Sequence, residues 1–147
     1  MTVSRKELYS GSMVIFIALF YLISGGLQVL QASANGVDWP EIKMLLLAVF
    51  YLASGILLLR KRNAGWIMST GVLLNFVLVM LVFLISMSQG AAFNGYAAMA
   101  IILFFLLLLA LVFLFNRNTR KKFAVNNKSY LATISVYLAL IAVNFLT

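Results

Sequence analysis

Cysteine and histidine are both absent from this chain of 147 residues. Without cysteine there is no disulfide and no thiolate nucleophile, and without histidine the most common general base and metal ligand is missing. Charge is scarce as well, because only 10% of the residues are charged, against about 25% in soluble domains. The sequence therefore does not predict a water-soluble surface.

Hydrophobic residues make up 65% of the chain and occur in long blocks rather than in alternation. A hydrocarbon core about 30 Å thick needs roughly 20 helical residues. Five blocks approach that length, near 12–31, 43–60, 66–87, 96–115 and 129–146. They predict an all-α integral membrane protein, a single domain over 1–147 with five transmembrane helices and short loops. The first four blocks are unambiguous, whereas the fifth contains Thr133, Ser135 and Asn144 and can instead lie in the interface as a helix.

Basic residues outnumber acidic ones, 11 to 3, which gives a net charge of +8. If every block spans, ten of the eleven fall on one side of the membrane and only Lys43 falls on the other. The positive-inside rule then predicts a cytoplasmic amino terminus and an outer carboxyl terminus, in a cell membrane. Because the basic residues lie between apolar blocks, no nucleic-acid partner is expected.

The block at 12–31 is followed by Ala32-Ser33-Ala34, which matches the cleavage pattern of a signal peptide. Its apolar run is longer than the 7–15 residues typical of such peptides, so we expect an uncleaved span. Aromatic side chains near the ends of the predicted spans suggest headgroup anchors. These are Tyr9, Trp39, Trp66, Tyr96 and Tyr130.

One local repeat is present, in which residues 18–25 and 48–55 are identical at six of eight positions. In each copy an alanine, a tyrosine and a glycine share one helical face, and small residues allow close helix packing. The repeat predicts packing at Gly25 and Gly55, or a pseudo-symmetric pair of helices that forms a site. A second small-residue seam lies in the fifth block, at Ala132, Ser135, Ala139 and Ala142.

Four polar residues fall near the middle of their predicted spans, namely Tyr21, Tyr51, Asn75 and Tyr137. A polar group in hydrocarbon needs a partner, so this predicted midplane cluster is expected to point inward. Its members either hold the helices together or bind an apolar solute with one or two polar groups, such as a lipid or a quinone.

A basic segment precedes the fifth block and is expected to meet lipid headgroups, or only to set the topology. It contains Arg117, Arg120, Lys121, Lys122 and Lys128. No charged residue lies centrally in a predicted span, and no nucleophile–base pair or metal-ligand set is present. We therefore expect neither an enzyme nor a cofactor.

The leading expectation for function is an accessory or interaction subunit that packs against itself or against another membrane protein. The alternative is an oligomeric pore or carrier for an uncharged or lipidic solute, lined by the midplane residues. The expected partners are thus the lipid bilayer and a second copy or another membrane protein.

Overall fold

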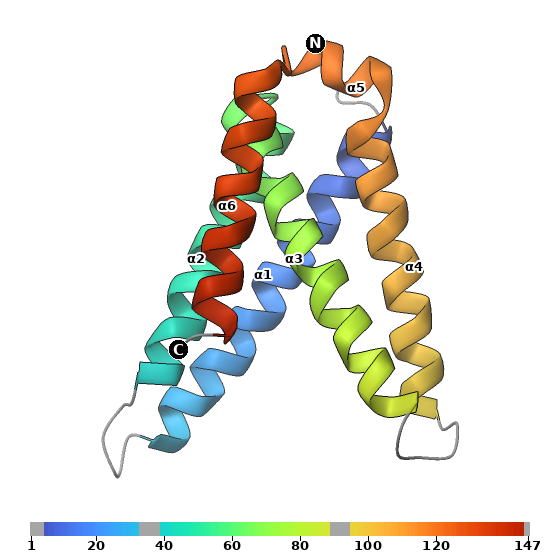
Figure 1. Cartoon of the computed structure of the whole chain (residues 1–147). Helices are drawn as coiled ribbons and strands as arrows, with labels where there is room; N and C mark the ends of the chain where they lie inside the picture. The colour runs from blue at the N-terminus through green and yellow to red at the C-terminus, as the bar shows by residue number, and fades with distance from the viewer. Residues whose placement is uncertain (1–4, 33–38, 89–94, 146–147) are drawn as a thin grey trace.

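The computed structural model describes residues 5–32, 39–88 and 95–145, and within them every regular element is a helix. The elements are α1 (Arg5–Ala32), α2 (Trp39–Leu59), α3 (Asn63–Ser88), α4 (Gly95–Phe115), α5 (Arg117–Lys122) and α6 (Asn127–Phe145). Figure 1 shows their arrangement, with colours that run from blue at the amino terminus to red at the carboxyl terminus.

Four of these helices are long and apolar enough to cross a membrane. The qualifying segments are Arg5–Gln31, Ile42–Leu59, Asn63–Ser86 and Ala97–Phe115. They indicate a membrane helical bundle and confirm the first four predicted helices, with α1, α2 and α3 each beginning at least three residues earlier than the sequence suggested. The described part of α6 is not among the four, although it is a continuous helix of 19 residues.

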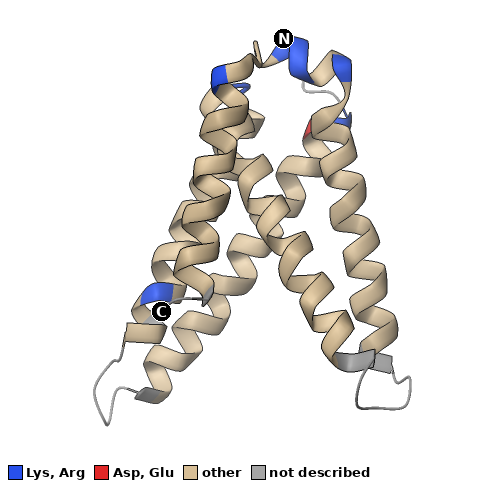
Figure 2. Cartoon of the chain, in the orientation of Figure 1, with Lys and Arg blue, Asp and Glu red and all other residues tan. Residues whose placement is uncertain are grey.

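The helices form two antiparallel hairpins, α1–α2 and α3–α4, which cross and diverge toward one end of the bundle (Figure 1). The most extensive contact is between α1 and α2, and α6 packs mainly on α3. At one end of the molecule, here called the basic end, lie α5 and ten of the eleven basic residues, while Lys43 lies at the opposite end (Figure 2).

Helix α6 extends from the basic end to the opposite end. At its start, Asn63 and Ser129 lie within hydrogen-bond distance, with Asn63 Nδ2 3.3 Å from Ser129 Oγ. Near its other end, Lys43 Nζ donates to the Val143 carbonyl at 3.4 Å. It therefore runs beside α2 from the turn between α2 and α3 to the start of α2, whereas α3, with 26 residues against 19, extends past its end (Figure 1).

The segment between α4 and α6 was predicted as a loop, and this prediction is wrong, because it contains α5. The Asn116 side chain caps α5 by accepting from the Asn118 N–H at 3.0 Å. After α5, Ala124 takes a positive φ of 49° while Val125 N donates to Arg120 O at 3.0 Å. This is the hydrogen-bonded reversal that commonly ends helices.

The turn between α2 and α3 is tight. Lys61 has a φ of 55°, and Arg62 N donates back to Leu57 O at 3.1 Å. The reversal presses the first turn of α3 onto the last turn of α2, so that a Cβ placed on Gly65 would collide with the backbone of Leu57 and Leu58. Only glycine fits at this position.

Trp66 was predicted as a headgroup anchor, but it is fully buried. Its indole N–H donates to the Leu114 carbonyl at 3.0 Å, and its ring meets Tyr130 edge to face at 5.6 Å. Because the indole has both an apolar environment and a hydrogen-bond partner, it joins the start of α3 to α4 and α6. Trp39 remains exposed.

Candidate functional site

The two copies of the sequence repeat pack against each other. A methyl group on Gly25 would lie 3.3 Å from Leu45 Cδ2, and one on Gly55 would lie 2.7 Å from Ile15 Cγ1. Positions 15 and 45, like 25 and 55, are 30 residues apart, which is the repeat offset. Each glycine of one copy therefore meets the equivalent neighbour of the other, as in an internal two-fold pair.

Aromatic rings lie at the centre of this pair. The rings of Tyr21 and Tyr51 are 5.3 Å apart and nearly perpendicular. Phe76 of α3 meets both, at 5.7 Å from Tyr21 and 5.6 Å from Tyr51. These are favourable edge-to-face distances. The structure thus brings two members of the predicted midplane cluster together, and α3 supplies a phenylalanine that the sequence reasoning did not single out.

Buried polar atoms near this centre lack partners. Asn75 is 1% exposed, and neither its Oδ1 nor its Nδ2 has a hydrogen-bond partner. The Tyr51 hydroxyl, the Thr70 hydroxyl and Asn144 Nδ2 are in the same situation. The Asn144 side chain lies near the Tyr51 hydroxyl without reaching hydrogen-bond geometry. Unpartnered groups of this kind are costly in an apolar interior.

Tyr137, the fourth predicted member of the midplane cluster, is half-buried on α6. It does not take part in the ring contacts that join Tyr21, Tyr51 and Phe76. Asn144, about two helical turns beyond Tyr137 on α6, stands near Tyr51 instead. In the sequence, Asn144 could have been recognised as a candidate for the cluster because it is a polar amide within an apolar run.

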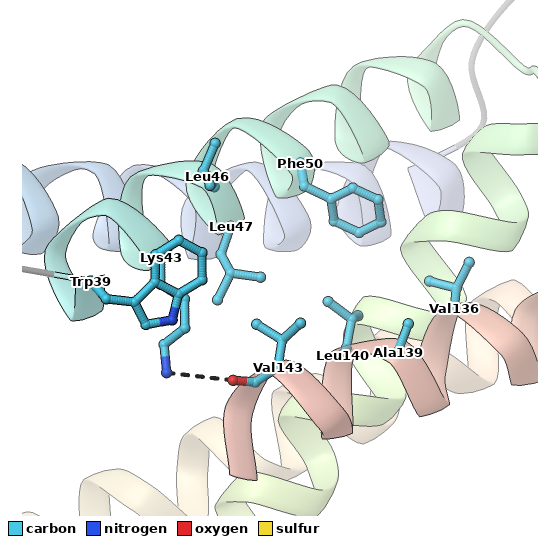
Figure 3. Close-up of a pocket in the computed structure, with 9 residues that line it drawn as sticks. All are labelled: Trp39, Lys43, Leu46, Leu47, Phe50, Val136, Ala139, Leu140 and Val143. Carbon is cyan, nitrogen blue, oxygen red and sulfur yellow. Dashed lines mark hydrogen bonds between the residues drawn. The ribbon is translucent and has the colours of Figure 1, made fainter. Parts of the chain in front are cut away.

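An apolar groove of about 350 Å³ separates α2 from α6. Figure 3 shows its lining side chains, with those of α2 facing those of α6 across the open space. Leu47 and Leu140 are buried, while Ala139 is exposed. Among the lining residues that the structure describes, Lys43 is the charged one, at the end of the groove where Trp39 also lies. The full lining is Trp39, Lys43, Leu46, Leu47, Phe50, Val136, Ala139, Leu140 and Val143.

The small-residue seam of α6 is directed largely away from the bundle. Ser135 and Ala139 are exposed, and Ala132 and Ala142 are half-buried. The contact of α6 with α3 uses Val136 instead, whose Cγ1 would lie 2.8 Å from a methyl group on Gly71. Ser135 is therefore available for contact with another helix, whereas Ala139 lines the groove between α2 and α6.

An ion pair between a buried carboxylate and an exposed lysine at the basic end was not predicted. Glu7 of α1 is 1% exposed, and its Oε1 accepts from Lys122 Nζ of α5 at 3.0 Å. Nearby, Ser10 donates to the Ala110 carbonyl at 3.0 Å, so polar contacts join the start of α1 to α4 as well. In the sequence, Glu7 appears only as one acid beside the basic Arg5 and Lys6.

The predicted headgroup residues divide among three places. Arg117, Arg120 and Lys121 line one hollow of about 250 Å³ between α5 and the start of α6. Lys122 lines a second hollow, of about 330 Å³, with Arg5, Lys6 and Glu7. Lys128 is exposed on the first turn of α6. The short helix α5 therefore presents basic groups on two sides.

Comparison with known proteins found no relative of this chain. No protein-family model, no curated protein and no solved structure matches the chain.

Proposed function

We propose that this is a non-enzymatic, multi-pass membrane protein that binds a lipidic molecule in the groove between α2 and α6. The observation that carries the proposal is the groove itself, which is apolar along its length and has an ammonium group and an indole at one end. An acyl or isoprenoid chain suits such a lining, and a polar headgroup suits Lys43 and Trp39. The unpartnered Tyr51 and Asn144 lie one helical turn from the lining residues Leu47 and Leu140.

The size of the groove is that of a small-molecule site. Its volume of about 350 Å³ lies within the range of ligand pockets, about 300–1,000 Å³. A single hydrocarbon chain suits this volume and this apolar lining.

The substitution Ala139→Trp is expected to block the groove, because the indole would occupy the space between α2 and α6. Photolabelling with a diazirine-bearing fatty acid, followed by peptide mapping, should mark 39–50 and 136–143 in the wild-type protein. In Ala139→Trp the labelling should fall about ten-fold, a loss of about 1.4 kcal/mol in binding.

Leu138→Trp is the matched control, since Leu138 is exposed on α6 but does not line the groove. It should keep the wild-type labelling. Equal labelling of the wild type and Ala139→Trp would show that the probe reports only surrounding lipid, and the proposed function would be abandoned.

The second candidate function is an accessory subunit that docks a helix of a second copy or of another membrane protein. It is favoured by the exposed seam on α6, because small residues let helices approach closely in a membrane. Purification in mild detergent separates the two candidates: a stoichiometric partner or dimer that is lost in Ser135→Leu supports docking. Ser135 does not line the groove, so this variant should leave photolabelling intact.

The proposed topology places the basic end in the cytoplasm of a cell and lets α6 complete a fifth span. The ten basic residues at that end support this orientation by the positive-inside rule. A phosphatase fused to Thr147 should therefore be active, as the carboxyl terminus would lie outside. Cytoplasmic fluorescence from a fluorescent protein at the same position, with an inactive phosphatase, would place α6 within the interface instead.

A further inference from the structure

The hollow between α5 and the start of α6 has an unbalanced charge. Arg117, Arg120 and Lys121 all line it, and none of its lining residues is acidic. The nearby carboxylate of Glu7 is paired with Lys122 in the other hollow, on the far side of α5. Three cations around about 250 Å³ without a carboxylate among them favour an anionic occupant.

The central cation of this hollow is held in place. Arg120 Nη1 donates to the Tyr130 hydroxyl at 2.7 Å. Its Nε is buried and has no hydrogen-bond partner. A guanidinium held by this hydrogen bond at the edge of the hollow is a pre-oriented positive group for an oxyanion.

The amino-terminal end of α6 lies at the same hollow. Asn126 Oδ1 accepts from the Ser129 N–H at 3.0 Å, and Tyr130 N donates to Asn126 O at 3.2 Å, which closes the first turn. Asn127, the first residue of α6, lines the hollow. The positive end of the helix dipole therefore faces the same space as the three side chains.

The depth of the hollow identifies the source of the anion. Under the proposed topology, α4 ends at Phe115 and α6 begins at Asn127, so the hollow lies where both helices leave the hydrocarbon. Tyr130, which holds Arg120, also stacks on Phe115 at 6.5 Å, immediately below. We infer that this hollow binds the phosphate of an anionic phospholipid of the cytoplasmic leaflet, a site separate from the α2–α6 groove.

The test is a lipid titration of the detergent-purified protein by native mass spectrometry, with phosphatidylglycerol and phosphatidylcholine as probes. The wild type should bind phosphatidylglycerol at least five-fold more tightly, since each basic residue near a membrane surface adds about that factor. Arg120→Gln should lower this preference about five-fold. Tyr130→Phe, which keeps the ring and all charges, should reduce it by releasing the guanidinium.

Arg60→Gln is the charge-matched control, because Arg60 is exposed at the same end and lines neither hollow. Its affinity should stay within two-fold of the wild type, and the melting temperature of every variant shows that the fold persists. An equal loss of phosphatidylglycerol affinity in Arg60→Gln and Arg120→Gln would show that the lipid is attracted only by the overall positive charge of this end. That result would overturn the inference. Displacement of the lipid by millimolar inorganic phosphate would overturn it too, by showing a site for a soluble anion.

Discussion

Gly65→Ala is expected to lower the melting temperature of the detergent-solubilised protein by about 10 °C, or to abolish folding. The new methyl group would collide with the backbone of Leu57 and Leu58, and backbone cannot rotate away as a side chain can. Overpacking lowers the free energy of unfolding by about 1–3 kcal/mol even where side chains can move aside. Because backbone is in the way here, about 3 kcal/mol is the smallest loss that we expect. Each kcal/mol corresponds to about 2–4 °C for a chain of this size.

Gly26→Ala makes the same chemical change in α1, at a position where a Cβ meets nothing within 4 Å. Because alanine favours a helix by about 1 kcal/mol over glycine, this control should be neutral or stabilising. If the two variants melt at the same temperature, the tight packing of α2 against α3 at the turn does not exist in solution.

Gly55→Leu is expected to disrupt the α1–α2 pair, at a cost of about 3 kcal/mol, and Gly25→Leu to do so by less. Any side chain at Gly55 approaches Ile15 Cγ1 to 2.7 Å and the Gly11 carbonyl oxygen to 3.3 Å. At Gly25 the nearest atom, Met44 Cβ, is 3.2 Å away. Thermal unfolding followed by size-exclusion chromatography in detergent measures both changes.

The internal symmetry offers a compensation test for the same pair. Ile15→Ala should recover part of the stability lost in Gly55→Ala, since it removes the nearest obstructing atom, Ile15 Cγ1. Leu45→Ala should recover less of the loss in Gly25→Ala, because Met44 Cβ remains 3.2 Å from the new methyl group. Gly26→Leu serves as the control for Gly25→Leu. Additive losses in both double variants would mean that the two copies of the repeat do not face each other as described.

Long apolar blocks were enough to predict four helices, because length and hydropathy are properties of the local sequence. The repeat likewise indicated which small residues lie between α1 and α2, since identical faces on adjacent antiparallel helices can meet across a two-fold axis. The short helix α5 was missed because its six residues carry no apolar period. It depends on the Asn116 cap and on the reversal at Ala124.

The groove and the ion pair could not be predicted, because both depend on how distant segments are placed. The groove exists where α2 and α6 stand apart, and no residue pattern records a distance between helices. Glu7 and Lys122 are 115 positions apart, and a single acid among basic neighbours indicates no partner. Tyr21 and Tyr51 lie in contact, as the repeat suggested. The direction in which Tyr137 faces is set by the rotation of α6 about its own axis, which the sequence pattern does not determine.

The separation of Glu7 from Lys122 also bears on the order in which the molecule is assembled. At about 5–20 residues per second, a ribosome adds Lys122 roughly 6 to 23 seconds after Glu7. During that interval the carboxylate of Glu7 has no ammonium from α5. This contact between the start of α1 and α5 can therefore form only after the first four long helices have been synthesised.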